Sequence, residues 1–160
     1  IDYNNFVKKI IDYNNNNVID VANAKLFHKI IFLLTNIIYF IPIIIYGFNI
    51  PTCSIMFMGI ISSIFHYQQC KNNCCQHKIK QMLWFDIIVV CVIGLIFWVS
   101  FIRFTNIYWY LISIISFGFF LIPTDVSKNL YMAAHGMWHL LTGCLFLYLI
   151  YMSKQNTIST

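Results

Sequence analysis

The sequence predicts an all-α protein, a polytopic transmembrane helix bundle. Of its 160 residues, 60% are hydrophobic and only 9% are charged, whereas an ordinary soluble domain carries roughly 25% charged residues. The mean hydropathy is +0.74. The apolar residues also gather into five long runs, most of which approach the ~20 residues that a helix needs to cross a bilayer. These observations exclude a soluble globular domain.

We predict five membrane spans, in chain order. They cover residues 30–48, 51–67, 82–101, 107–122 and 131–152. The fourth span is the weakest, because its roughly 16 residues rise only about 24 Å as a helix, against a hydrocarbon core of ~30 Å.

The polar ends of the chain frame this transmembrane domain, which we place at residues 26–152. Residues 1–25 are polar and rich in asparagine, with four in a row from Asn14 to Asn17. Such a composition builds no core, so we expect a flexible lead-in. Residues 153–160 form a short carboxyl-terminal tail.

The basic residues predict the orientation in the membrane. If the five spans alternate, the amino terminus and the loops near residues 68–81 and 123–130 share one side, and the positive-inside rule makes that side cytoplasmic. Its excess of positive charge suggests anionic lipid headgroups as neighbours and gives no reason to propose nucleic acid. Eight of the ten basic residues lie there: Lys8, Lys9, Lys25, Lys29, Lys71, Lys78, Lys80 and Lys128.

Four polar residues within the spans converge at this same side. His66 ends the second span, Asp86 lies one turn into the third, and His135 and His139 lie one to two turns into the fifth. An ionisable or imidazole side chain in a bilayer is costly without a partner, so such residues usually face one another, a cavity or a metal. We therefore expect these four side chains to meet.

Their spacing suggests a hydrolytic metal site. His135 and His139 stand four residues apart and share one helix face, and His66 completes a set of three imidazoles. Such a set suits Zn²⁺ with an open fourth position, where a bound water loses its proton near neutral pH. Asp86 is then placed as general base, and Ser62, one turn before His66, as a hydrogen-bonding partner of the water or of a substrate carbonyl. The predicted reaction is hydrolysis of an amide or ester.

Other interpretations stay open. For His28 and His77 a structural hydrogen bond is expected, and Ser63 competes with Ser62 for the role at the water. The three histidines would serve equally in a non-catalytic protein with a structural zinc, or two of them would ligate a haem. On the cytoplasmic side Cys70, Cys74 and Cys75 are expected to be reduced, as a second metal site or as lipidation sites.

The motifs resemble those of the CREST superfamily of seven-helix membrane hydrolases, which includes alkaline ceramidases, progestin and adipoQ receptors, Per1-type proteins and the myomaker group. "SSIFH" contains its Ser-x-x-x-His element, "WFD" its Asp element and "HGMWH" its His-x-x-x-His element, while "TNIIYFIP" is similar to a first-helix pattern. The resemblance implies zinc on His66, His135 and His139, with Asp86 and Ser62 at the water.

Two branches of the superfamily remain open for this chain. "HGMWHLLTG" is most similar to the last-helix motif of alkaline ceramidases, whereas the cysteine-bearing stretch between His66 and Asp86 is more like the myomaker group. A sphingolipid or phospholipid substrate is implied, in the endoplasmic reticulum, Golgi or plasma membrane. The chain departs from the superfamily in its five expected helices instead of seven.

Overall fold

The computed structural model describes Val21 and residues 24–71, 76–101, 107–120 and 128–158, and the regular secondary structure of these residues is entirely helical. The prediction of an all-α fold is thereby confirmed. In chain order the elements are α2 (Leu26–Leu34), η2 (Thr35–Phe40), α3 (Ile41–Tyr46), α4 (Ile50–Cys70), α5 (Gln76–Phe101), α6 (Ile107–Phe120) and α7 (Lys128–Ile158).

Four helical stretches in the described part of the chain are long and apolar enough to cross a membrane, which indicates a membrane protein. They are Leu26–Tyr46, Ile50–Cys70, Gln81–Phe101 and Asn129–Gln155. Helix α6 has the position of the fourth predicted span, but its 14 residues rise only about 21 Å at ~1.5 Å per residue. Side chains such as Ile44, which is 79% exposed, and Leu95, which is 62% exposed, are suited to contact lipid.

The first membrane stretch is a single rod with a tighter middle. It runs through α2, the 3₁₀ segment η2 and α3 without a break. Pro42 lies just after η2 and has no N–H to donate to the carbonyl one turn back, which weakens α-helical winding at this point. At the other end of η2, the Thr35 hydroxyl donates to the carbonyl oxygen of Phe32 at 2.7 Å.

Helix α4 begins with a capping box. The Asn49 side chain accepts a hydrogen bond from the backbone N–H of Thr52 at 3.0 Å, and the Thr52 hydroxyl accepts one from the backbone N–H of Asn49 at 3.1 Å. These bonds satisfy N–H groups that a helix start leaves free. The chain therefore reverses sharply after α3, and α4 returns beside the first membrane stretch.

Glycines on α7 let η2 approach closely. A Cβ atom on Gly143 would lie 2.5 Å from Ile38 side-chain atoms, and one on Gly136 would lie 3.0 Å from the Thr35 methyl group. These two glycines are seven residues apart and thus share one face of the helix. The close packing brings the Tyr39 hydroxyl within 2.8 Å of the Thr142 hydroxyl.

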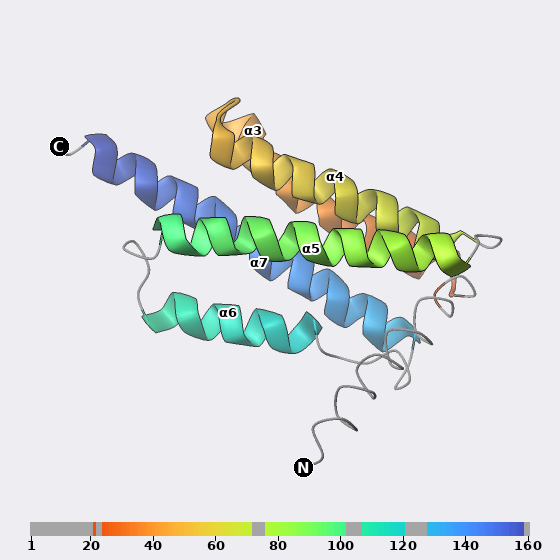
Figure 1. Cartoon of the computed structure of the whole chain (residues 1–160). Helices are drawn as coiled ribbons and strands as arrows, with labels where there is room; N and C mark the ends of the chain where they lie inside the picture. The colour runs from red at the N-terminus through yellow and green to blue at the C-terminus, as the bar shows by residue number, and fades with distance from the viewer. Residues whose placement is uncertain (1–20, 22–23, 72–75, 102–106, 121–127, 159–160) are drawn as a thin grey trace, which may run out of the picture.

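Helices α5 and α6 pack against α4 and α7. Helix α5 lies along α4, and α6 lies along α7, where Trp109 stacks on Tyr148 with ring centroids 3.7 Å apart. In Figure 1, α5 crosses in front of α7 and α6 runs below α5. Aromatic and aliphatic side chains, among them Tyr39, Phe97 and Phe146, fill the core between these helices.

Some sequence-based predictions concern residues outside those the structure describes. These include residues 1–20, Cys74, Cys75 and the side chain of His77. At the carboxyl end, α7 continues to Ile158, so most of the predicted tail after residue 152 is helical.

Candidate metal centre

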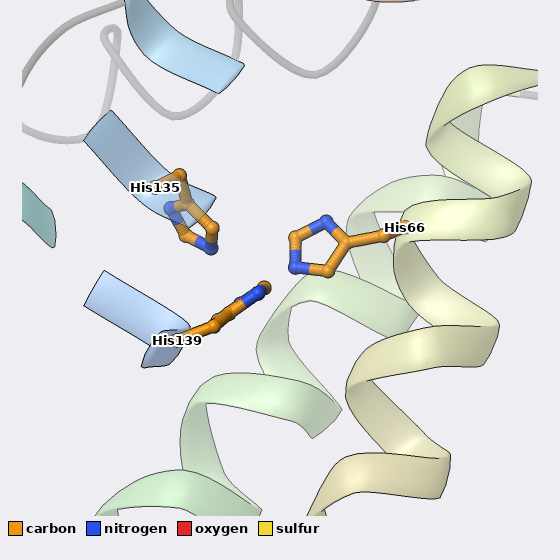
Figure 2. A group of neighbouring side chains, drawn as sticks. All are labelled: His66, His135 and His139. Carbon is orange, nitrogen blue, oxygen red and sulfur yellow. The ribbon is translucent and has the colours of Figure 1, made fainter. Parts of the chain in front are cut away.

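Three buried histidines meet in the bundle. His66 lies near the carboxyl end of α4, and His135 and His139 lie in the first half of α7. Figure 2 shows their imidazole rings facing one another across a small space. One ring nitrogen from each lies within 4.8 Å of the others, and the ring centroids are 4.8 to 5.0 Å apart. This arrangement can hold a metal ion.

The His139 ring is oriented by the first membrane stretch. Its Nδ1 atom lies 2.9 Å from the Thr35 hydroxyl oxygen. Because the Thr35 hydroxyl donates its proton to the Phe32 carbonyl oxygen, it accepts from Nδ1–H. A neutral imidazole carries one proton, so Nε2 of His139 retains a lone pair.

The His66 ring is oriented from its own helix. Its Nδ1 atom lies 3.0 Å from the amide oxygen of Gln69, which can only accept, so Nδ1 carries the proton and Nε2 again has the lone pair. The amide nitrogen of Gln69 donates in turn to the Tyr131 hydroxyl at 3.4 Å. This chain of bonds links His66 on α4 to the start of α7.

His135 is enclosed by aromatic rings and has no hydrogen bond to either ring nitrogen. The rings of Phe32, Phe120, Tyr131 and Trp138 lie with their centroids 5.1 to 5.8 Å from that of His135. Its tautomer is therefore not fixed by a partner, and either nitrogen is available to a metal.

The unsatisfied nitrogens fit a metal. Nε2 of His66, Nε2 of His139 and both ring nitrogens of His135 are buried without a hydrogen-bond partner. Leaving a buried polar atom unsatisfied costs about 1–3 kcal/mol, and several such atoms facing one space are typical of ligands. Zinc–nitrogen bonds of about 2.0–2.1 Å would require the three rings to move closer together.

The same geometry argues against haem. Axial histidines stand on opposite faces of a porphyrin, yet here the three ring centroids lie only 4.8 to 5.0 Å apart, with His135 edge to face against both of the other rings. No macrocycle fits between them. His28, for which a structural hydrogen bond was expected, is half-buried and is not part of the histidine group, and its Nδ1 atom has no hydrogen-bond partner.

Asp86 and Ser62 lie on neighbouring helices. Asp86 on α5 is 5% exposed, with Oδ1 lacking a hydrogen-bond partner, and Ser62 on α4 is 1% exposed, with its hydroxyl also lacking one. The Ser62 hydroxyl lies near the Asp86 carboxyl group. Ser63, in contrast, donates to the carbonyl oxygen of Gly59 at 2.6 Å, so of the two adjacent serines only Ser62 has a free hydroxyl.

Asp86 forms part of the wall of a cavity of about 270 Å³ between α5, α6 and α7. The wall is mostly apolar. Trp138 is part of this wall, and its ring centroid lies 5.2 Å from that of His139. The cavity and the histidine group are therefore neighbours. A cavity that is mostly apolar with a few polar groups is the usual form of a binding site for a small molecule.

Sequence reasoning assigned no role to Phe32, Thr35 or Gln69, although Thr35 begins the "TNIIYFIP" pattern. Phe32 packs against all three histidines, most closely against His66 with ring centroids 4.5 Å apart. The spacing of Gln69, three residues after His66, was an available signal, since such pairs meet on a helix. Nothing in the sequence indicated that Phe32 and Thr35 would face the last helix.

No family model, curated protein or solved structure matches this chain. The resemblance to the CREST superfamily therefore rests on the motif residues themselves and stays a prediction.

Proposed function

We propose that this protein is an integral-membrane, zinc-dependent hydrolase that cleaves an amide or ester bond of a membrane lipid. The observation that supports this most is the group of unpartnered, buried imidazole nitrogens beside a mostly apolar cavity whose wall contains a carboxyl group. A lipid hydrolase needs these two parts together: a centre that activates water and a space for an alkyl chain.

Zinc is the metal that suits the donor set best. All three donors are neutral nitrogens, with Nε2 preset on His66 and His139 by their hydrogen bonds. Three histidine ligands are one of the sets typical of catalytic zinc. When bound, zinc supplies a Lewis acid that lowers the pKa of water and polarises a carbonyl group.

Asp86 and Ser62 supply the remaining chemistry in this proposal. The Asp86 carboxylate accepts a proton from water as the water oxygen bonds to the substrate carbonyl carbon. The bond from that carbon to nitrogen or oxygen then breaks, and Asp86 returns the proton to the leaving amine or alcohol. The Ser62 hydroxyl, which has no other partner, donates to the carboxylate or to the carbonyl oxygen.

A sphingolipid or phospholipid on the cytoplasmic side would be the substrate. The exposed apolar side chains keep the protein in the bilayer, where such lipids are its solvent. At the end of α4 near His66, the Lys29 ammonium group donates to the carbonyl oxygen of Cys70 at 3.0 Å. Lys29 therefore lies at the same end of the bundle as His66. A basic residue at this end supports a cytoplasmic position for it, by the positive-inside rule.

A structural metal is the second candidate. The residues that line the cavity include Asp86 but none of the three histidines. A metal held by the histidines would therefore join α4 to α7 without touching a substrate in the cavity. A non-catalytic membrane-remodelling or receptor-like protein would keep such a clamp.

The test combines metal analysis with turnover. Wild-type protein in lipid nanodiscs is measured for zinc by mass spectrometry and then incubated with a panel of ceramides, lysolipids and phospholipids. We expect near-stoichiometric zinc and release of a fatty acid from one lipid class, with turnover abolished in Asp86→Asn and reduced in Ser62→Ala while zinc is retained. Ser63→Ala is the matched control and should stay active. Zinc without turnover on any lipid would favour the structural clamp, and absence of zinc would end the proposal.

A further inference from the structure

The five serine hydroxyls of α4 and α6 fall into two groups. Ser54, Ser63 and Ser113 each donate to the carbonyl oxygen four residues earlier, at 2.6 to 2.8 Å, as serines in membrane helices commonly do. Ser62 and Ser116 are the exceptions, since both are 1% exposed and neither hydroxyl has a hydrogen-bond partner. Ser62 is explained by its position at Asp86. Ser116 is not explained by any part of the proposed hydrolytic group.

Ser116 lies in the wall of the cavity, on a different helix from Asp86. Asp86 is on α5 and Ser116 is on α6. Phe120, one turn after Ser116, packs against His135 with ring centroids 5.8 Å apart, so Ser116 belongs to the part of the cavity near the histidines. Farther from the histidines, the wall contains Gly94, Leu145 and Phe146. The Ser113 and Thr142 hydroxyls also line the cavity, but each donates to a backbone carbonyl oxygen of its own helix.

Among the described residues of the wall, the polar atoms without a hydrogen-bond partner therefore lie at one end, on Asp86 and Ser116. A buried hydroxyl without a partner costs about 1–3 kcal/mol. A molecule in the cavity that forms a hydrogen bond with Ser116 would remove this cost. A volume of about 270 Å³ lies just below the ~300–1,000 Å³ of typical small-molecule sites. Such a volume suits one alkyl chain with a small head.

We propose that Ser116 is a substrate-binding residue, whose hydroxyl holds an uncharged carbonyl or hydroxyl group at the head of one alkyl chain lodged in this cavity. The chain extends toward Gly94 and Phe146, and its head lies between Ser116 and Asp86. This inference deepens the proposed hydrolase function and rests on it, since it places the reacting end of a lipid beside the histidine centre.

A non-hydrolysable probe tests binding apart from turnover. The probe is a radiolabelled medium-chain methyl ketone, which has a carbonyl group but no bond that hydrolysis can cleave. Its binding to zinc-loaded protein in nanodiscs is measured against empty nanodiscs, with the alkane of equal length as the unlabelled competitor. We expect saturable binding that the alkane displaces poorly.

The decisive comparison is between two serines one turn apart. Ser116→Ala should weaken probe binding about 3- to 10-fold, the effect of losing one hydrogen bond, whereas Ser113→Ala should change it less than about twofold because the Ser113 hydroxyl is already bonded to Trp109. Ser116→Thr retains a hydroxyl and should restore binding. Unchanged zinc content in all three variants would show that the fold is intact.

The outcomes separate this inference from the hydrolase proposal. Equal binding by Ser116→Ala and wild type, or equal losses in Ser116→Ala and Ser113→Ala, would overturn the role of Ser116 even if the protein hydrolyses lipids. Binding that depends on Ser116 in a protein without turnover would support the cavity site while refuting the hydrolase.

Discussion

The hydroxyl oxygen of Thr35 lies 2.9 Å from Nδ1 of His139, across a gap of 104 residues in the sequence. Thr35 belongs to a membrane stretch that contributes no metal-ligand candidate among the described residues. By accepting from Nδ1–H it fixes the proton on the far side of the ring and leaves Nε2 facing His66 and His135. A threonine in the first membrane stretch thus determines which ring nitrogen of His139, a candidate metal ligand in the last stretch, carries the proton.

Removing this hydroxyl should weaken metal binding. Thr35→Val keeps the shape of the side chain but cannot accept the ring proton, and we expect zinc affinity to fall about 10- to 100-fold, the usual effect of losing such a supporting bond. Competition with a fluorescent zinc chelator measures this. Thr35→Ser should restore most of the affinity, and a Thr35→Val protein with wild-type affinity would show that the bond does not orient His139.

Removing a ligand should have a larger effect than removing a histidine elsewhere. Metal analysis of His139→Ala should find almost no zinc, because two nitrogens from separate helices hold a metal poorly. His28→Ala is the control, since His28 is half-buried and is not a member of the histidine group. Equal zinc loss in both variants would point to unfolding instead of ligation.

Gly143 should not tolerate even a methyl group. Alanine at Gly143 would place its Cβ atom 2.5 Å from Ile38, and overpacking of this kind costs about 1–3 kcal/mol. At Gly118 on α6 nothing described lies within 4 Å of such an atom, and alanine there should be neutral or stabilising because it favours helix. Unfolding in mixed micelles would compare the two, and similar free energies of unfolding would argue against the close approach of η2 to α7.

Phe32 should matter for both stability and metal binding. It is 1% exposed and packs against all three histidine rings, so Phe32→Ala should lower the free energy of unfolding by about 3–5 kcal/mol and loosen the zinc site. Phe27 in the same helix is 68% exposed, and Phe27→Ala should leave both properties nearly unchanged. Zinc affinity and unfolding, measured on both variants, test this, and a stable Phe32→Ala protein with full zinc affinity would contradict it.

Much of the fold followed from the sequence, because length and apolar content alone identify membrane helices. The shortness of the fourth apolar run was also visible, and α6, with 14 residues, is indeed shorter than each of the four membrane stretches. The 3₁₀ winding of η2 was not predicted, since it reflects both Pro42 and the packing of Ile38 against Gly143.

The candidate site was predictable only in part. His135 and His139 could be paired by spacing, and His66 joined them because of its expected depth in the bilayer. Ser113 and Ser116 look alike in the sequence, and only the rotation of α6 and the choice of hydrogen bond distinguish them. The same applies to Thr35, whose partner depends on how close two helices approach.

The ligand candidates come from α4 and α7, which are joined in the chain only through α5 and α6. An ion shared by His66, His135 and His139 would therefore act as a cross-link between distant parts of the chain. Its binding energy would add to the stability of the folded state, by about 2.7 kcal/mol when the free metal concentration is ~100 times its dissociation constant. The abundance of this protein in a cell would then follow the supply of metal, with scarcity removing the folded protein as well as its function.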